Sequence, residues 1–279
     1  MINAIPLFPN TKETREELVN SSFSNALNTY LHWKSRIIPN RKRKTALLPS
    51  LTQDKHWKIL KSPIKALLDK VENGLDINPF LSEKAHKKGY TSHSNILSRQ
   101  NIWLDKDRIL NLYHYHHFHH FHHFHLNMKI KDNNISERTE YLLFAEISRE
   151  KFTAIGIFDH TVFDDVLPDS ISEERKRLLD IHYKRISQFL PHGSNFLTSS
   201  QITSTGHPIH IREWGNKIAN ILVNNDNKLD NRIEVNAIYT VFNKPPPDKF
   251  NFEWQLIDLD LYLHNKKTGE KFLYYKGHL

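Results

Sequence analysis

The sequence predicts an α+β protein in which a helical, basic N-terminal segment is followed by antiparallel sheet with a few helices. Apolar residues recur at helical spacing in the first third of the chain. After Trp103 the pattern changes to short aromatic and β-branched runs separated by polar turns, which is typical of antiparallel strands. Hydrophobic residues make up 38% and charged residues 25% of the 279, a balance typical of a soluble globular chain.

Two helices are predicted in the N-terminal third. Thr11 is placed to cap a helix that runs to about Trp33, because the carboxylates that follow Thr11 complement the helix dipole. Apolar residues at helical spacing predict a second helix over residues 52–71. Pro63 is expected to kink or break this helix, and Gly74 to end it.

Three β-type runs follow in the middle of the chain: Phe121–Lys129, Tyr141–Ser148 and Phe152–Asp159. A turn of three residues joins the second and third runs, so we expect an antiparallel meander. Residues 172–189 then return to helical spacing.

The C-terminal part is predicted to be mainly β. A strand is expected at 207–214 and a short helix at 215–223, followed by strands at 233–242, 252–263 and 271–275. Asp258 and Asp260 alternate on the second of these strands and are interpreted as surface charge.

The chain is accordingly divided into three regions. Residues 1–100 form a basic helical region, 101–200 a β-meander plus helix that is the expected active region, and 201–279 a mainly β region.

Positive charge is confined to the first third of the chain. Residues 1–100 hold 17 Lys+Arg and 8 Asp+Glu, an excess of +9, whereas the other 179 residues hold 22 and 23. The densest run consists of Arg41, Lys42, Arg43 and Lys44. A one-sided distribution is typical of a protein that binds a polyanion, so we expect these four residues to contact nucleic acid. A solvated basic surface and an acidic protein partner are the alternatives.

Several classes of chemistry are excluded. Cysteine is absent, which excludes disulfides, thiolate nucleophiles and iron–sulfur clusters. No phosphate-binding loop, dinucleotide-binding loop, serine-hydrolase elbow or H-E-x-x-H motif occurs, and no cofactor is expected. The N-terminus lacks a secretory pattern and no apolar run approaches the roughly 20 residues that span a bilayer, so we expect a cytoplasmic protein without membrane contact.

Histidine is concentrated in one tract. Eight of the 19 histidines lie in the twelve positions from His114 to His125, which contain a His-His-Phe triplet repeat from His116 to Phe124. A period of three matches neither the strand period of two nor the helical period of 3.6, so the repeat resembles a codon-repeat expansion. Only one end of such a repeat need be functional. If the end of the tract is a strand, His123 and His125 share one face of it, and Phe124 and Leu126 the other.

Three interpretations of the tract remain open. It is a structural tract without chemistry, a set of catalytic imidazoles that need no metal, or part of a metal site. A metal site needs a third ligand beyond His123 and His125, for which His160, His207 and His210 are available.

Polar side chains stand at the ends of the three predicted meander strands. His123 and His125 lie on the first strand, Arg138 leads into the second, and His160 closes the third. Because the end of the third strand of a meander lies beside the end of the first, we expect these four side chains to converge. Two imidazoles and a cation suit cleavage of a phosphodiester, in which one imidazole takes a proton, the other gives one, and the cation stabilises the developing charge.

This hairpin, with an arginine near its start and a histidine closing its last strand, resembles the compact ribonuclease toxins of the RelE/YoeB-like group. The resemblance covers about residues 121–190 and implies cleavage of RNA. It departs from that group in length and in having His160-Thr161 where His-Arg is usual.

The leading hypothesis is therefore a bacterial toxin or phage-defence effector that cleaves RNA without a metal, through His123, His125, Arg138 and His160. RNA or the ribosome is the expected partner, with an antitoxin or similar protein that neutralises the activity. A non-enzymatic nucleic-acid-binding or regulatory protein, and a histidine-rich metal-dependent hydrolase, are the alternatives.

Overall fold

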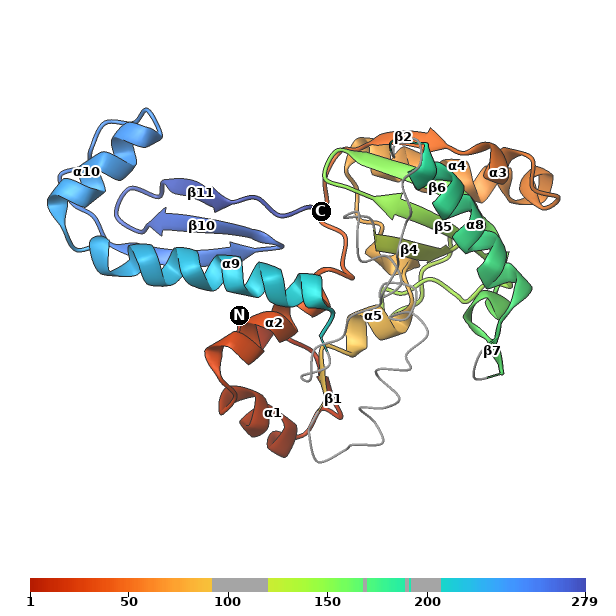
Figure 1. Ribbon diagram of the computed structural model, residues 1–279, viewed down its shortest axis with the longest axis horizontal. Coiled ribbons are helices and arrows are strands. Elements are labelled where there is room, and N and C mark those ends of the chain that lie inside the picture. The colour runs from red at the N-terminus through yellow and green to blue at the C-terminus, as the bar shows by residue number, and fades with distance from the viewer. Residues whose placement is uncertain (92–119, 168–169, 189–190, 192–206) are drawn as a thin grey trace.

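The computed structural model describes residues 1–91, 120–167, 170–188, 191 and 207–279 (Figure 1). It has mixed helices and mainly antiparallel sheets, with helices in the N-terminal segment, so the predicted α+β class is confirmed. A sheet flanked by helices forms one part of the molecule, and a smaller sheet with two helices forms the other. Within the described ranges, no helix has the length and apolar character needed to cross a membrane.

The larger sheet has the strand order β2-β6-β5-β4. Strands β4 (His120–His125), β5 (Tyr141–Ile147) and β6 (Lys151–Asp159) form the predicted antiparallel meander. The fourth strand, β2 (Lys44–Leu47), was not predicted. It begins at the last residue of the basic run and pairs in parallel with β6.

The two faces of this sheet are buried in different cores. Phe124, Leu126 and Leu143 pack into a large core together with apolar residues of α4 (Trp57–Asn73). On the opposite face, a smaller core is shared by the sheet, the short helix η3 (His160–Phe163) and α8 (Glu173–Ser187), which lies at the predicted position. The smaller core consists of Phe121, Leu142, Phe144, Ile155, Phe158, Val162, Phe163 and Leu178.

The N-terminal helix predicted to run to Trp33 is instead two helices, α1 (Lys12–Val19) and α2 (Phe23–Lys34). Thr11 caps α1 as predicted. Ser22 caps α2 by accepting a hydrogen bond from the amide of Asn25 at 3.2 Å. A serine side chain that accepts a hydrogen bond from an unpaired amide in the first turn marks the start of a new helix. The spacing of the apolar residues alone did not predict this second start.

Short elements connect these helices to the sheet and complete the chain before α9. They are η1 (Ile2–Ala4), β1 (Leu7–Phe8), α3 (Pro49–Thr52), η2 (Asn78–Phe80), α5 (Glu83–Lys87), β3 (Tyr90–Thr91), β7 (Asp165–Leu167) and β8 (Ser170–Ile171). β1 pairs in parallel with β3, and β7 pairs with β8 in an antiparallel ladder.

Helix α4 continues through Pro63 and ends at Gly74, as predicted for Gly74. Gly74 has φ 70°, and a Cβ there would lie 2.9 Å from the backbone nitrogen of Lys42. Gly74 thus ends α4, and its lack of a side chain allows the backbone of Lys42 to lie close to Gly74.

We expect Gly74→Ala to lower the free energy of unfolding by about 1 kcal/mol more than Gly269→Ala does. Both glycines have a positive φ, but a Cβ at Gly269 meets nothing within 4 Å. Both variants pay the backbone cost of the left-handed conformation, and only Gly74→Ala also crowds Lys42. Urea unfolding measures the free energy of unfolding of both variants. Equal losses of stability would contradict the close approach of Lys42 to Gly74.

The C-terminal region contains two helices as well as three strands. α9 (Ile209–Asn225) replaces the strand predicted at 207–214 and the shorter helix predicted at 215–223. Ile211, Trp214 and Ile218 are buried along one face of α9 at helical spacing. The strand prediction was wrong because the apolar residues of this segment recur at helical spacing and do not alternate.

Two further predictions in this region were also wrong. Residues predicted as a strand at 233–242 form helix α10 (Arg232–Val241), in which Val235 and Tyr239 are buried one turn apart. The segment 252–263 is two strands, β9 (Phe252–Ile257) and β10 (Asp260–Asn265), which pair in an antiparallel hairpin. Asp258 has φ 54° in the tight turn between them, and β11 (Lys271–Tyr275) completes the sheet.

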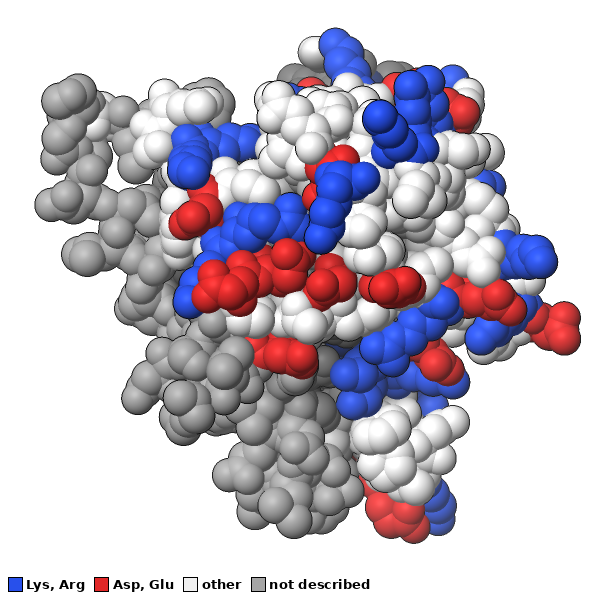
Figure 2. All heavy atoms as spheres, turned by 90° about the vertical axis from the view of Figure 1, so that its right-hand side faces the viewer, with Lys and Arg blue, Asp and Glu red and all other residues white. Residues whose placement is uncertain are grey.

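The face that carries α3, α4 and α8 has charges of both signs. Figure 2 shows acidic side chains gathered in a band across this face, with Lys and Arg side chains on both sides of the band. This face is therefore not a continuous basic surface.

Candidate active site

Four side chains from three segments meet at one end of the larger sheet. The ring centres of His123 and His125 on β4 are 6.3 Å apart, and the ring of His160 lies 6.0 Å from that of His125. Arg138, in the connection that leads into β5, places Nη2 3.2 Å from Nδ1 of His160. The structure thus brings together all four of the residues predicted as catalytic.

The backbone of Thr139 holds two of these imidazoles. Its amide donates a hydrogen bond to Nδ1 of His125 at 3.2 Å, so Nε2 carries the proton of the neutral His125 ring. Its carbonyl oxygen lies 2.8 Å from Nε2 of His160 and can only accept, so Nε2 donates there. Nδ1 of a neutral His160 ring is then an acceptor, and it faces the guanidinium of Arg138. Nε of Arg138 also lies 3.4 Å from Nε2 of His160, but the shorter bond to the carbonyl decides the tautomer.

Aromatic rings hold His123. Its ring stacks on Phe144 with centres 5.6 Å apart and meets the edge of Phe163 at 5.0 Å. Phe163 also lies 6.3 Å from the ring of His160, so it contacts two of the predicted catalytic residues. The sequence reasoning missed Phe163, although its position three residues after His160 places it on the same helical turn.

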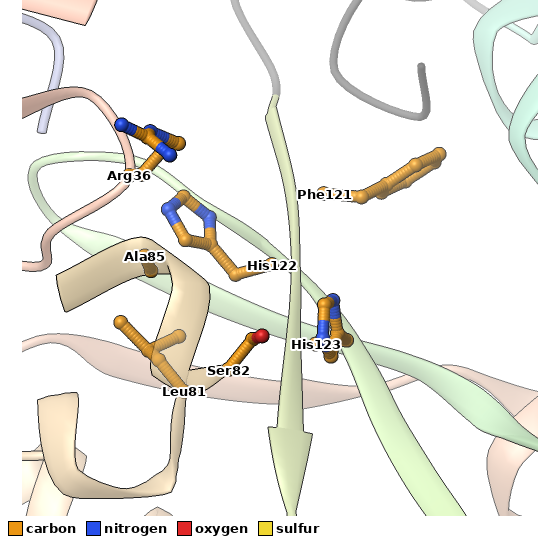
Figure 3. A pocket seen from close by; sticks show the side chains of 7 residues that line it. All are labelled: Arg36, Leu81, Ser82, Ala85, Phe121, His122 and His123. Atoms are coloured by element: carbon orange, nitrogen blue, oxygen red, sulfur yellow. The ribbon is translucent and has the colours of Figure 1, made fainter. Parts of the chain in front are cut away.

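The strand register separates the histidines of the tract. His123 pairs with Phe144 and His125 with Leu142, so both histidines lie on the face of the smaller core. His122 lies on the opposite face, where it points toward Arg36 and Ala85 beside a small cavity of about 30 Å³ (Figure 3). The predicted sharing of one face by His123 and His125 is confirmed, and the part of the tract before His120 lies outside the described residues.

A second polar cluster on the same face was not predicted. Glu146 and His182 are both buried, and Oε1 of Glu146 lies 3.1 Å from Nδ1 of His182. Arg185 pairs with the other carboxylate oxygen, and the ring of Phe121 lies 4.9 Å from that of His182. The available signal was a single carboxylate in the otherwise apolar strand Tyr141–Ile147.

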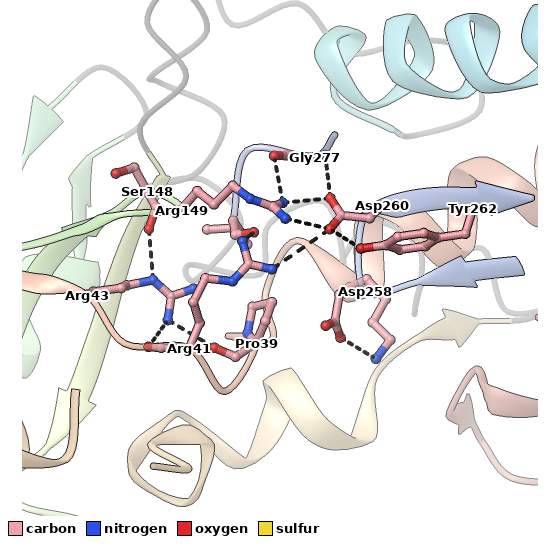
Figure 4. A network of polar contacts seen from close by, with 11 residues as sticks. Pro39, Arg41, Arg43, Ser148, Arg149, Asp258, Asp260, Tyr262 and Gly277 are labelled. Carbon is pink, nitrogen blue, oxygen red and sulfur yellow. Dashed lines mark hydrogen bonds and ion pairs between the residues drawn. The ribbon is translucent and has the colours of Figure 1, made fainter. Parts of the chain in front are cut away.

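The two arginines of the basic run, Arg43 and Arg41, are buried and partly buried (Figure 4), whereas Lys42 and Lys44 are exposed. Arg43 is 4% exposed and donates hydrogen bonds to the carbonyl oxygens of Pro39 and Ser148 at 2.9 and 2.8 Å. Burial, together with the neighbouring cations Arg41 and Arg149, lowers the pKa of Arg43 to about 10. The prediction that Arg43 contacts nucleic acid therefore does not fit its place in the fold.

Arg41 links the segment that leads into β2 to the C-terminal sheet of β9, β10 and β11. It donates a hydrogen bond to the carbonyl oxygen of Leu279 at 3.0 Å and lies 3.9 Å from the carboxylate of Asp260. Arg149 forms two hydrogen bonds to the same carboxylate, at 2.7 and 2.8 Å. Asp260, interpreted from the sequence as surface charge, is 3% exposed and is the centre of this network.

Three residues of the run, Lys42, Arg43 and Lys44, line a surface hollow. With Thr45, Glu72 and Glu150 they border an open cavity of about 760 Å³. Two carboxylates among these residues offset most of the positive charge, so this hollow alone is a weak site for a polyanion.

Within the described part of the chain, no three His, Asp or Glu side chains are grouped so that they could hold a metal ion. The tract positions before His120, which the metal interpretation also concerns, lie outside that part.

The chain matches no protein-family model, no curated protein and no solved structure. A function for the site therefore has to be argued from its geometry and chemistry.

Proposed function

We propose that the chain is an endoribonuclease that needs no metal and uses His123, His125, Arg138 and His160 on one phosphodiester. The observation that supports this proposal is the convergence of three imidazoles and one guanidinium from three separate segments. Ring centres about 6 Å apart allow two imidazoles to reach different oxygens of one phosphate.

His160 is suited to be the general base. Its Nδ1 is an acceptor, and the imidazolium formed when Nδ1 takes a proton is stabilised at Nε2 by the carbonyl of Thr139. The ribose 2′-hydroxyl would give this proton while its oxygen forms a bond to phosphorus. Arg138 now occupies Nδ1, so substrate binding would have to transfer the guanidinium to the phosphate, where it stabilises the added negative charge.

The remaining imidazoles serve the other half of the reaction. Nδ1 of His125 accepts from the Thr139 amide, so His125 acts through its Nε2–H as a hydrogen-bond donor to a phosphate oxygen. His123, in its imidazolium form, protonates the 5′-oxygen as the bond from phosphorus to that oxygen breaks. The products are a 2′,3′-cyclic phosphate and a 5′-hydroxyl.

The test is to incubate the purified chain with RNA oligonucleotides in excess chelator and to analyse the new ends by mass spectrometry. We expect 2′,3′-cyclic phosphate and 5′-hydroxyl ends, and no cleavage where a single 2′-deoxynucleotide precedes the scissile bond. Cleavage of the deoxy substrate would exclude the 2′-hydroxyl as nucleophile. Intact RNA with only salt-sensitive binding would favour a non-enzymatic nucleic-acid-binding protein.

In a cell, this activity suits a toxin or phage-defence effector that acts in the cytoplasm on free or ribosome-bound RNA. An unrestrained ribonuclease would need a partner that neutralises it. Induced expression is expected to stop growth with fragmentation of RNA.

A further inference from the structure

A separate cavity of about 350 Å³ opens at the same end of the sheet as the candidate active site. It is bordered on one side by the start of α4 and on the other by α8, and its lining includes Asp54, His56, Tyr141, Asp159, Glu174 and Arg177. This volume lies within the range of small-ligand sites in proteins.

Two lining residues connect this cavity to the proposed catalytic residues. Asp159 directly precedes His160 in the chain, and Tyr141 is paired with Asp159 across β5 and β6. Tyr141 also follows closely after Thr139, whose backbone holds His125 and His160. The Tyr141 ring lies on the face of the sheet opposite to His125. A nucleotide whose phosphate lay at His160 would therefore have to pass around the end of the sheet to place its base in the cavity.

The cavity contains an aromatic surface. The rings of His56 and Tyr141 have centres 4.0 Å apart and planes inclined by 32°. Flat aromatic surfaces of this kind bind nucleobases by stacking in proteins that recognise single-stranded RNA.

The polar part of the cavity favours hydrogen-bond donors over a phosphate. The charge of Arg177 is satisfied within the lining, because its guanidinium lies 3.3 Å from a carboxylate oxygen of Asp54 and 2.7 Å from one of Glu174. Burial, and then the carboxylates of Glu140, Asp159 and Asp54, raise the pKa of Tyr141. The lining holds three carboxylates against the two cations Lys55 and Arg177, so its net charge is negative and it is rich in acceptors.

Asp159 is the carboxylate best placed to meet a ligand. Its Oδ1 accepts hydrogen bonds from both the amide and the hydroxyl of Thr161. Among the described residues, no donor reaches Oδ2 of Asp159.

We propose that this cavity binds the guanine base of the nucleotide next to the scissile phosphate, an inference that rests on the ribonuclease function proposed above. Guanine is the one standard base with two adjacent donors, N1–H and the N2 amino group, on its Watson–Crick edge. Adenine and cytosine offer one amino donor and uracil one imino donor. A carboxylate that accepts from this edge and an aromatic face that stacks on the ring together select guanine.

Two measurements on the full-length protein test the proposal. In the first, titration calorimetry compares guanosine 3′-monophosphate with the adenosine, cytidine and uridine monophosphates. In the second, cleavage rates are compared for RNA oligonucleotides that differ in one base at the scissile position. We expect guanosine to bind about 10-fold or more tightly than the others and cleavage to favour guanine by a similar factor.

The variant Asp159→Asn is expected to remove most of this preference, because its amide replaces an acceptor with a donor. Asparagine caps helices as well as aspartate does, so η3 and His160 should keep their places. Asp258→Asn is the matched control, since it makes the same change at a carboxylate on the other sheet, away from the cavity, and should keep the preference.

The two measurements separate this proposal from the ribonuclease function. Selective binding of the guanosine monophosphate without cleavage of any RNA would support the guanine site and overturn the ribonuclease proposal. Cleavage without base preference, together with equal binding of all four monophosphates, would overturn the guanine site and leave the ribonuclease function standing.

Discussion

Replacement of His160 by alanine is expected to lower the rate of RNA cleavage by at least about 100-fold, because general acid–base catalysis contributes factors of this order or larger. His160 supplies the only Nδ1 that both faces Arg138 and is opposed by a carbonyl at Nε2 among the described residues. Its removal takes away the proton acceptor and also releases Arg138 from its position. Single-turnover cleavage of one RNA oligonucleotide measures the effect.

The matched control is His264→Ala. His264 lies in β10 on the other sheet, where its Nδ1 is 3.2 Å from a carboxylate oxygen of Glu253, away from the candidate active site. This variant removes an imidazole from the same chain and should cleave at the wild-type rate. If His160→Ala retained full activity while folded, the assignment of this site would be wrong.

The largest effect on stability is expected from Asp260→Asn, which should lower the free energy of unfolding by about 3 kcal/mol. The carboxylate of Asp260 accepts hydrogen bonds from Arg149, from Tyr262 and from the amide of Gly277. Loss of its charge leaves the partly buried Arg149 without its counter-ion and weakens the junction between the larger sheet and the C-terminal sheet (Figure 4).

Asp258→Asn is the control for loss of one negative charge in the same hairpin. Its carboxylate forms a longer pair with Lys34, at 3.6 Å, and is 37% exposed. An exposed pair of this kind contributes about 1 kcal/mol or less. Urea unfolding of the two variants should therefore differ clearly, and equal midpoints would show that the Asp260 network does not stabilise the junction.

The contribution of Asp260 should also depend on pH. Burial alone raises the pKa of this carboxyl, but the hydrogen bonds from Arg149 and Gly277 outweigh burial and bring the pKa below its ordinary value. A carboxyl with a lower pKa in the folded than in the unfolded state stabilises the fold above about pH 4 and loses this effect as the pH falls further. The stability difference between wild type and Asp260→Asn should therefore begin to shrink as the pH falls below about 5, and continue to shrink as the pH falls below the ordinary aspartate pKa of about 4.

Much of the candidate site could be predicted because its residues stand at the ends of strands that are adjacent in sequence. The meander requires the end of β6 to lie near the end of β4, so His160 approaches His125 whatever else the chain does. The role of the Thr139 backbone could not be predicted, since every residue has the same amide and carbonyl. Phe163 and the Glu146–His182 pair depend on how η3 and α8 pack on the sheet.

The sequence by itself determined the α+β class, the three strands of the meander and the face shared by His123 and His125. These features depend on local periodicity, which a short window of residues contains in full. The tertiary structure alone decided that Arg43 is buried and that Lys44–Leu47 becomes a sheet strand. Each of these outcomes depends on partners far away in the chain, such as Ser148 for Arg43 and β6 for β2, and local composition carries no information about which partner arrives.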